Sequence, residues 1–178
     1  DVSFNDIEGT LPNLEHLKQL EFLSIYNNSK LSYNVSDIQK VFPKFNYVIS
    51  KDVQSAVKNS DLVIISVPLS SYKEVLLSAK DSFQKDVIIT DTGSVKKEIN
   101  RIFENLNLKN VFWLTSHPIA GTEESGPNAG FKDLFKDRWT IICDEKETNK
   151  DNIEKLKKFW EFLGSKVKLM SIKDHDHI

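Results

Sequence analysis

From residue 51 onward, apolar and polar positions alternate in blocks that predict alternating strands and helices. The runs Leu62 to Val67 and Val87 to Thr90 are apolar at nearly every position, as in parallel strands covered on both faces. Amphipathic segments, which predict helices, cover residues 53–59, 72–83, 95–106 and 152–163, and further strand-like runs cover residues 111–115, 138–143 and 166–170. This rhythm predicts an α/β fold with a doubly wound, mostly parallel sheet.

The first fifty residues do not continue this pattern. A doubly wound nucleotide-binding sheet begins with a strand, a GxGxxG turn and a helix, but Gly9 stands alone here. Two interpretations of Asp1 to Ser32 are equally open. Its spaced leucines and asparagines weakly resemble one leucine-rich repeat, although one repeat cannot form a stable solenoid. Alternatively, residues 14–20 end a first helix and residues 22–26 form a strand.

Composition narrows the class of partner. The 178 residues carry 24 basic and 26 acidic side chains, a formal charge of −2, with the two signs interspersed. No basic patch indicates nucleic acid or an anionic membrane, so we expect a small molecule or another protein as the partner. Cys143 is the only cysteine and cannot form an internal disulfide, and no long apolar run is present. A cytoplasmic location fits these features.

Polar or glycine-containing turns follow the predicted strands in three places, Ser66 to Tyr72, Thr90 to Ile99 and Thr115 to Phe131. Ligands bind at the carboxyl ends of the strands in open α/β sheets, so these turns form the candidate site. Ser94 in the second turn could cap the following helix or point into the site, and taken alone the residue favours capping. The third turn is long enough to indicate a functional loop.

His117 is the candidate general base. It follows a predicted strand and precedes Pro118, which favours extended backbone and a fixed ring position. A lone histidine is more often structural, but a hydroxyl at a neighbouring turn and a carboxylate six residues later are the company a general base needs. On the residues alone, both interpretations stay open.

Other conspicuous side chains favour structural interpretations. Trp139 and Trp160 lie on a predicted strand and a predicted helix face, where core packing is expected. The terminal run of residues 174–177, DHDH, has metal-ligating side chains too close together to point one way, so we expect no metal site.

Four strings carry a family resemblance, in this order and at these intervals: DLVIISVPLSSY, VIITDTGSVK, HPIAGTEESGPNAGFKDLFKDRW and FWEFLGSKVKLMSIKDHD. Together they resemble the prephenate dehydrogenases, including the cyclohexadienyl and arogenate dehydrogenases, over about residues 51–178. The third string is the most specific. The resemblance implies a Rossmann-like sheet that is incomplete here, without its GxGxxG turn and the family's helical C-terminal domain.

The resemblance also implies a reaction. The family converts prephenate, with NAD or NADP, to 4-hydroxyphenylpyruvate and carbon dioxide in tyrosine biosynthesis. His117 would take the proton of the substrate hydroxyl, Ser94 would bind that hydroxyl or orient the imidazole, and Glu123 would gate the site. Val67, Pro68, Thr92 and Gly93 would contact the cofactor.

The domain organisation follows from the same resemblance. We expect an atypical N-terminal segment over residues 1–50 and the catalytic half of a dinucleotide-binding domain over residues 51–178. We expect this chain alone to be inactive, and its full-length parent to be a homodimer. The alternatives are a non-enzymatic interaction protein with a repeat-like N-terminus, or another hydroxyacid dehydrogenase. The choices between NAD and NADP, and between prephenate and arogenate, remain open.

Overall fold

A computed structural model describes residues 9–10, 31–32, 52–121, 133–145 and 148–177. Within the N-terminal part, β1 (Gly9–Thr10) and β2 (Leu31–Ser32) pair in parallel. The two interpretations of the N-terminal sequence, a repeat or a helix with its strand, rest mainly on residues outside these described ranges. Glu123 also lies outside them.

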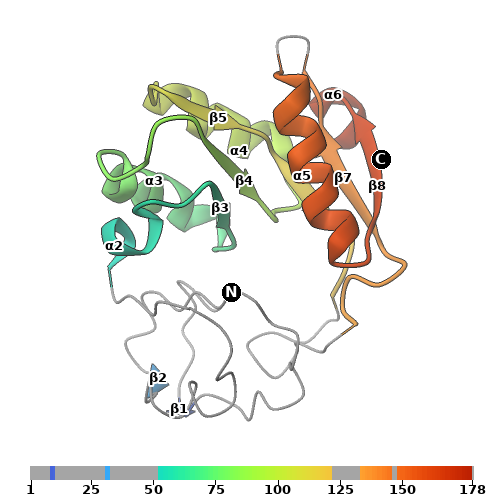
Figure 1. The fold of residues 1–178 in the computed structure, drawn as a ribbon, viewed down its shortest axis with the longest axis horizontal. Coiled ribbons are helices and arrows are strands. Elements are labelled where there is room, and N and C mark those ends of the chain that lie inside the picture. Colours follow the sequence, from blue (N-terminus) through green and yellow to red (C-terminus); the bar gives the residue numbers. More distant parts are fainter. Residues whose placement is uncertain (1–8, 11–30, 33–51, 122–132, 146–147, 178) are drawn as a thin grey trace.

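A parallel sheet forms the first half of the domain. Its strands β3 (Leu62–Ile65), β4 (Val87–Asp91) and β5 (Val111–Trp113) are ordered β3-β4-β5 (Figure 1). All five residues of the central strand β4 are buried, because helices cover both faces of the sheet. The prediction of an α/β fold with a mostly parallel sheet is confirmed.

Helices α3 (Tyr72–Ala79) and α4 (Lys96–Leu106) cover one face of this sheet. The short helices α2 (Val53–Val57) and η1 (Leu69–Ser71) precede α3, and α2 packs beside it. Asn107 ends α4 in the left-handed conformation with φ 47°, which asparagine tolerates better than most residues. The core between these helices and the sheet contains Ile65, Tyr72, Leu76, Val87, Ile89, Ile99 and Phe103.

A second, mixed sheet continues from the first. Its strands are β6 (Ser116–Pro118), β7 (Trp139–Cys143) and β8 (Lys166–Met170), with β6 antiparallel and β8 parallel to β7. The single strand predicted over residues 111–115 therefore ends early, and a second short strand begins at Ser116. The chain between them stays tied to both neighbours, since the N–H of Leu114 donates to β4 and the carbonyl of Thr115 accepts from β7.

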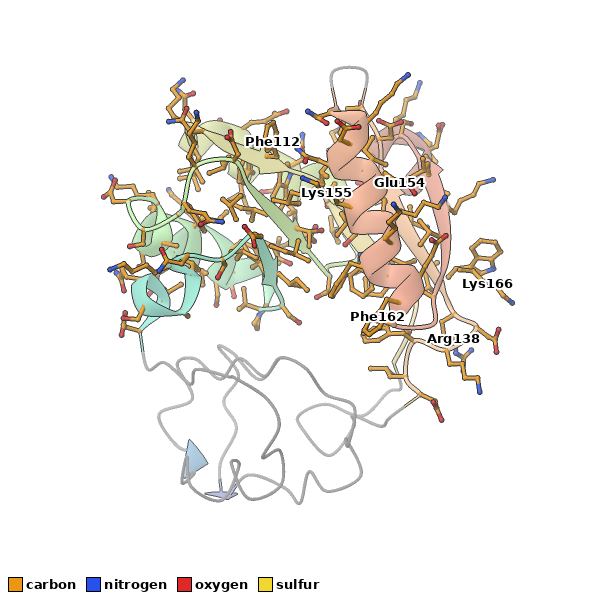
Figure 2. The ribbon with its side chains drawn as sticks, viewed as in Figure 1. Phe112, Arg138, Glu154, Lys155, Phe162 and Lys166 are labelled. Carbon is orange, nitrogen blue, oxygen red and sulfur yellow. The ribbon has the colours of Figure 1, made fainter. Side chains whose placement is uncertain are left out.

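Helix α5 (Lys150–Phe162) packs across the opposite face from α3 and α4 (Figure 1). Asn149 caps its N-terminus by accepting hydrogen bonds from two backbone N–H groups. Trp160 is buried beneath it at 1% exposure, as predicted, whereas the core position predicted for Trp139 is wrong because that residue is 51% exposed at the start of β7. Glu154 and Lys155 are exposed on the helix, and Figure 2 shows both.

The last described element is α6 (Ile172–His175), which begins after Ser171 and ends at Asp176. Ser171 caps it through a hydrogen bond from the N–H of Asp174. Although the helix is short, it brings His175 into a buried position. None of the described helices is long and apolar enough to cross a membrane.

Candidate active site

The strand ends of the parallel sheet bring the predicted cofactor-contacting residues to one edge. Val67 and Pro68 follow β3, whereas Thr92 and Gly93 follow β4, the neighbouring strand. The hydroxyl of Thr92 donates to that of Ser66 at 3.1 Å, which ties the two turns together. These side chains are uncharged, and all four residues keep some exposure to solvent.

Gly93 occupies a position without room for a side chain. A Cβ placed there would lie 2.5 Å from Cδ1 of Ile99 and 3.1 Å from the hydroxyl of Tyr72. It would also lie 3.2 Å from Oδ2 of Asp91, the same oxygen that accepts the N–H of Gly93 at 2.9 Å. Glycine here lets the turn after β4 pack tightly against the helix layer.

Four polar residues beneath this edge form a buried group that we call the Asp91 cluster: Asp91, Lys96, Thr115 and Ser116. The Lys96 ammonium lies 2.5 Å from Oδ2 of Asp91, and both side chains are fully buried. The other carboxylate oxygen, Oδ1, accepts the hydroxyl of Thr115 and the N–H of Ser116. Lys96 also donates to the carbonyl of Ser116 at 2.6 Å, so the cluster fixes the backbone just before His117.

Burial sets the protonation equilibria of the cluster. It lowers the pKa of Lys96, although the charge and hydrogen bond of Asp91 act in the opposite direction. Burial also raises the pKa of Tyr72, and the nearby Asp91 carboxylate raises it further. The phenol of Tyr72 therefore stays protonated and is available to donate to Asp91 at 3.4 Å.

His117 lies at the centre of β6, which pairs it with Ile141 of β7. Its Nδ1 is 2.9 Å from Nε2 of His175, at hydrogen-bonding distance, and the two rings are inclined by 65°. Within the described part of the chain, Nε2 of His117 has no hydrogen-bond partner. The half-buried ring is thus held through Nδ1, and no residue of the described ranges occupies Nε2.

Asp176 links this pair of histidines to helix α4. Its Oδ1 lies 2.7 Å from Nδ1 of His175 and accepts the N–H of Lys96 at 3.1 Å. Its Oδ2 accepts the N–H of Lys97 at 2.8 Å. Residues far apart in sequence therefore meet, with the carboxylate capping the N-terminus of α4, where negative charge is favoured.

The environment favours neutral His117. Burial lowers the pKa of His117 most, and positive charge on His175 and Lys96 lowers it further, against the opposing effects of Asp91 and Asp176. For Asp176, burial alone would raise the pKa, but hydrogen bonds from His175 and from the backbone N–H groups of Lys97 and Lys96 leave it below its usual value. Both directions leave an anionic Asp176 and a neutral His117 at neutral pH.

Ser94 does not cap α4, so the capping role that its sequence position favours is wrong. The helix begins at Lys96 after Val95, and no side chain at that position caps it. The anionic side chain of Asp176 takes the capping role instead. Ser94 is exposed, and its hydroxyl has no hydrogen-bond partner among the described residues.

Comparison with known proteins identifies the family. Residues 36–169 match the family described as prephenate dehydrogenase, nucleotide-binding domain. The chain belongs to this family. The match favours a dehydrogenase over a non-enzymatic interaction protein.

Curated relatives agree with that assignment. Cyclohexadienyl dehydrogenase of Zymomonas mobilis is 39% identical over 130 residues, which cover 73% of this chain and 44% of the relative. Prephenate dehydrogenase of Lactococcus lactis is 26% identical over 148 residues, covering 80% of this chain and 39% of that protein. The chain thus spans less than half the length of these relatives.

A solved structure shows the same fold. Prephenate dehydrogenase from Aquifex aeolicus in complex with hydroxyphenyl propionate and NAD+ matches with a TM-score of 0.67 and 27% identity. The match covers 86% of this chain and 52% of that one. Synechocystis arogenate dehydrogenase, at 18% identity and a TM-score of 0.64, supports the fold alone.

The carboxyl edge fits the nicotinamide end of a dinucleotide. The turn residues Val67, Pro68, Thr92 and Gly93 are small or apolar and uncharged, which suits a flat aromatic ring packed closely against the backbone. His117 on β6 of the second sheet has a ring nitrogen, Nε2, that lacks a hydrogen-bond partner among the described residues, as a proton acceptor requires. No group of three or more His, Cys, Asp or Glu residues able to hold a metal ion occurs in the described ranges.

Sequence reasoning missed the residues that hold His117 in place. Asp91 and Lys96 lie within the recognised string TDTGSVK, but their burial as an ion pair depends on tertiary packing. His175 and Asp176 were considered only as metal ligands. An alternative signal was available for this pair, because a histidine followed by an acid at the end of a predicted domain can orient a catalytic imidazole.

Proposed function

We propose that the whole protein carrying this chain is a dehydrogenase that oxidatively decarboxylates prephenate or arogenate with NAD or NADP. One observation carries the proposal: His117 is anchored through Nδ1, its Nε2 has no hydrogen-bond partner among the described residues, and it lies near the strand edge that gathers the residues predicted to contact the cofactor. The family match and the relatives' names support the substrate class. The NAD+ complex of the Aquifex aeolicus relative supports the cofactor class.

His117 acts as the proton acceptor in this reaction. The substrate hydroxyl donates a hydrogen bond to Nε2 of His117. Its proton moves to Nε2 as the C–H bond breaks at the ring carbon that bears the hydroxyl. A bound nicotinamide supplies the hydride acceptor. The ring carboxylate leaves as carbon dioxide, and the electron pair of its C–C bond enters the ring, which becomes aromatic. The substrate oxygen takes the proton back from Nε2 and becomes the phenol hydroxyl of the product. The lowered pKa of His117 keeps its lone pair available at neutral pH.

The other predicted site residues complete the proposal. Ser94 binds the substrate hydroxyl, which is supported by its exposed position and by the lack of a partner for its own hydroxyl within the described residues. Val67, Pro68, Thr92 and Gly93 contact the nicotinamide end of the cofactor. Glu123, which lies six residues after His117 in the sequence, gates the site, as the family resemblance implies.

The cellular setting is also a proposal. A cytoplasmic location is supported by the single cysteine, Cys143, which is free and buried. The homodimer is what the family resemblance implies for the whole protein. Burial raises the pKa of the Cys143 thiol to about 12, so this cysteine stays protonated and unreactive. Its role is structural.

Replacing His117 in the whole protein tests the function. His117→Asn should lower kcat about 10²-fold to 10⁴-fold, the usual contribution of a general base, while the Kd for NAD or NADP stays within about twofold. His177→Asn is the matched control, because this exposed ring contacts only a backbone carbonyl. Assays pairing prephenate or arogenate with NAD or NADP identify the substrate and cofactor. Unchanged turnover in His117→Asn would remove the catalytic assignment.

A further inference from the structure

The contacts around His175 define a directed chain of hydrogen bonds. Asp176 Oδ1 lies 2.7 Å from Nδ1 of His175, and Nε2 of His175 lies 2.9 Å from Nδ1 of His117. The same carboxylate accepts two backbone N–H groups at the start of α4. His175 is 8% exposed, so its ring is held inside this arrangement.

The polarity of this chain follows from its anchored end. A carboxylate oxygen only accepts hydrogen bonds, so Nδ1 of His175 must carry a proton. In a neutral imidazole the other nitrogen then bears a lone pair, and Nε2 of His175 must accept. The donor to it is the Nδ1–H of His117. This leaves the lone pair of His117 on Nε2.

We propose that His175 and Asp176 are positioning residues that hold His117 in its Nδ1–H tautomer, so that Nε2 is the proton-accepting atom. Neutral imidazole in water favours the opposite tautomer, which carries its proton on Nε2. In that tautomer Nε2 has no free lone pair and cannot accept a proton from the substrate. The arrangement thus selects the reactive form before substrate binds. It deepens the proposed function by assigning the tautomer and its cause, and it rests on that function only for its catalytic consequence.

The structural argument competes with one alternative state. If His175 were doubly protonated, it would donate to Nδ1 of His117, and His117 would carry its proton on Nε2. The pKa of Asp176 is lowered, so Asp176 is a carboxylate whether His175 is neutral or doubly protonated. Its charge therefore does not distinguish these two states of His175. The tautomer of His117 at a pH where both rings are neutral separates the two states.

Nitrogen NMR on this chain measures the tautomer directly, without substrate or cofactor. Long-range ¹H–¹⁵N spectra at about pH 8, above the ordinary histidine pKa of about 6.5, should show a protonated Nδ1 and an unprotonated Nε2 for His117. A wild-type His117 with its proton mainly on Nε2 would overturn the proposal, whatever the variants do.

Variants at His175 then test the cause. His175→Phe keeps the ring shape but removes both nitrogens, and the tautomer ratio of His117 should shift toward Nε2–H. His175→Gln offers a carbonyl oxygen to Nδ1–H of His117 and should restore part of the original ratio. His177→Phe, the exposed control, should leave it unchanged. A folded His175→Phe with the wild-type ratio would exclude His175 as the cause.

Activity gives a second, separable readout. In the whole protein, His175→Phe should lower kcat at least about 10-fold with little change in cofactor Kd, and His175→Gln should recover part of that loss. Loss of the Nδ1–H tautomer without loss of kcat would contradict the catalytic consequence. If the protein oxidises neither prephenate nor arogenate, the proposed function fails, whereas the tautomer measurement still decides the positioning role.

Discussion

Two carboxylates support His117 from opposite sides, and their surroundings differ. Asp91 is fully buried, pairs with Lys96 and accepts backbone N–H groups that fix the chain on either side of the site. Asp176 keeps more contact with solvent, caps α4 and reaches the ring of His117 through His175. Asp91 therefore positions the backbone of the site, and Asp176 positions its ring.

Burial decides how much each carboxylate matters to the fold. A charge inside the protein is tolerated only while its partner remains, whereas a partly exposed carboxylate can be replaced by water. The nearby charges act on the pKa of His117 in opposite directions: Lys96 and His175 lower it, whereas Asp91 and Asp176 raise it. Burial of the ring is then the largest cause of its lowered pKa.

The largest expected effect comes from breaking the buried pair. Asp91→Ala leaves the Lys96 ammonium without a counter-charge and removes the acceptor of the N–H groups of Gly93 and Ser116. We expect the free energy of unfolding, measured in urea, to fall by about 3–5 kcal/mol. Glu161→Ala on α5 is the control, since its Lys157 partner is 3.8 Å away and both side chains are exposed. It should cost less than about 1 kcal/mol.

A double variant separates the charge from the backbone donors. Adding Lys96→Met to Asp91→Ala removes the unpaired ammonium, so part of the stability should return. The remaining loss measures the cost of leaving the N–H groups of Gly93 and Ser116 without their acceptor. If Asp91→Ala alone costs no more than the exposed control, the cluster does not stabilise the fold as its burial indicates.

A smaller effect follows from crowding the same cluster. In Gly93→Ala, the new Cβ would lie 2.5 Å from Cδ1 of Ile99, so we expect a loss of about 1–3 kcal/mol in urea unfolding. Ile99→Val removes that terminal methyl. The double variant should therefore lose less than the sum of the two single losses. Strict additivity would show that the clash with Ile99 is not the cause.

Removing the second carboxylate should cost less than breaking the buried pair. Asp176→Ala takes away the side-chain cap of α4, and lost caps cost about 0.5–2 kcal/mol. Because the carboxylate is partly exposed, we expect a value near the lower end, measured by urea unfolding beside Asp91→Ala. Asp174→Ala is a neighbouring control, since its carboxylate accepts only the hydroxyl of Ser171. A loss equal to that of Asp91→Ala would remove the distinction between the carboxylates.

The sequence predicted the parallel half of the fold better than the site that it carries. Strand β3 and the first three residues of β4 are apolar, and the turns after both strands leave partly exposed the residues that were predicted to contact the cofactor. The break between β5 and β6 was not predictable, because residues 111–118 show no glycine or turn signal before Pro118. Pairing with β7 and β8 creates it, and that pairing depends on residues distant in sequence.

Tertiary contacts also explain the errors at individual residues. Trp139 has the pattern of a buried strand residue, but it opens β7 and remains exposed. Ser94 stands where a capping serine is common, yet Asp176 reaches the helix from the end of the described chain. A contact spanning 79 residues cannot be inferred from local spacing. His117 could be singled out as a candidate because the motif around it is local, and its catalytic role stays a prediction.

The smallest expected effect concerns the pH response of His117 itself. Its pKa in the folded protein lies below the unfolded value of about 6.5, so folding favours the neutral ring. The stability this contributes is fully present above the unfolded pKa and is lost as the pH falls through that value toward the folded pKa. A ¹H NMR titration of the ring should therefore give a midpoint below the usual histidine value.

The same NMR titration in Asp91→Ala and in Asp176→Ala compares the two carboxylates. Because each carboxylate raises the pKa of His117, loss of either charge acts to lower the midpoint. Asp176→Ala also removes the carboxylate that holds His175. In this variant we therefore expect the NMR signals of both His117 and His175 to change, whereas Asp91→Ala should affect mainly His117. His117→Gln should flatten the fall in stability between about pH 7 and pH 5. A midpoint above 6.5 in the wild-type chain would mean that burial does not dominate the ring's environment.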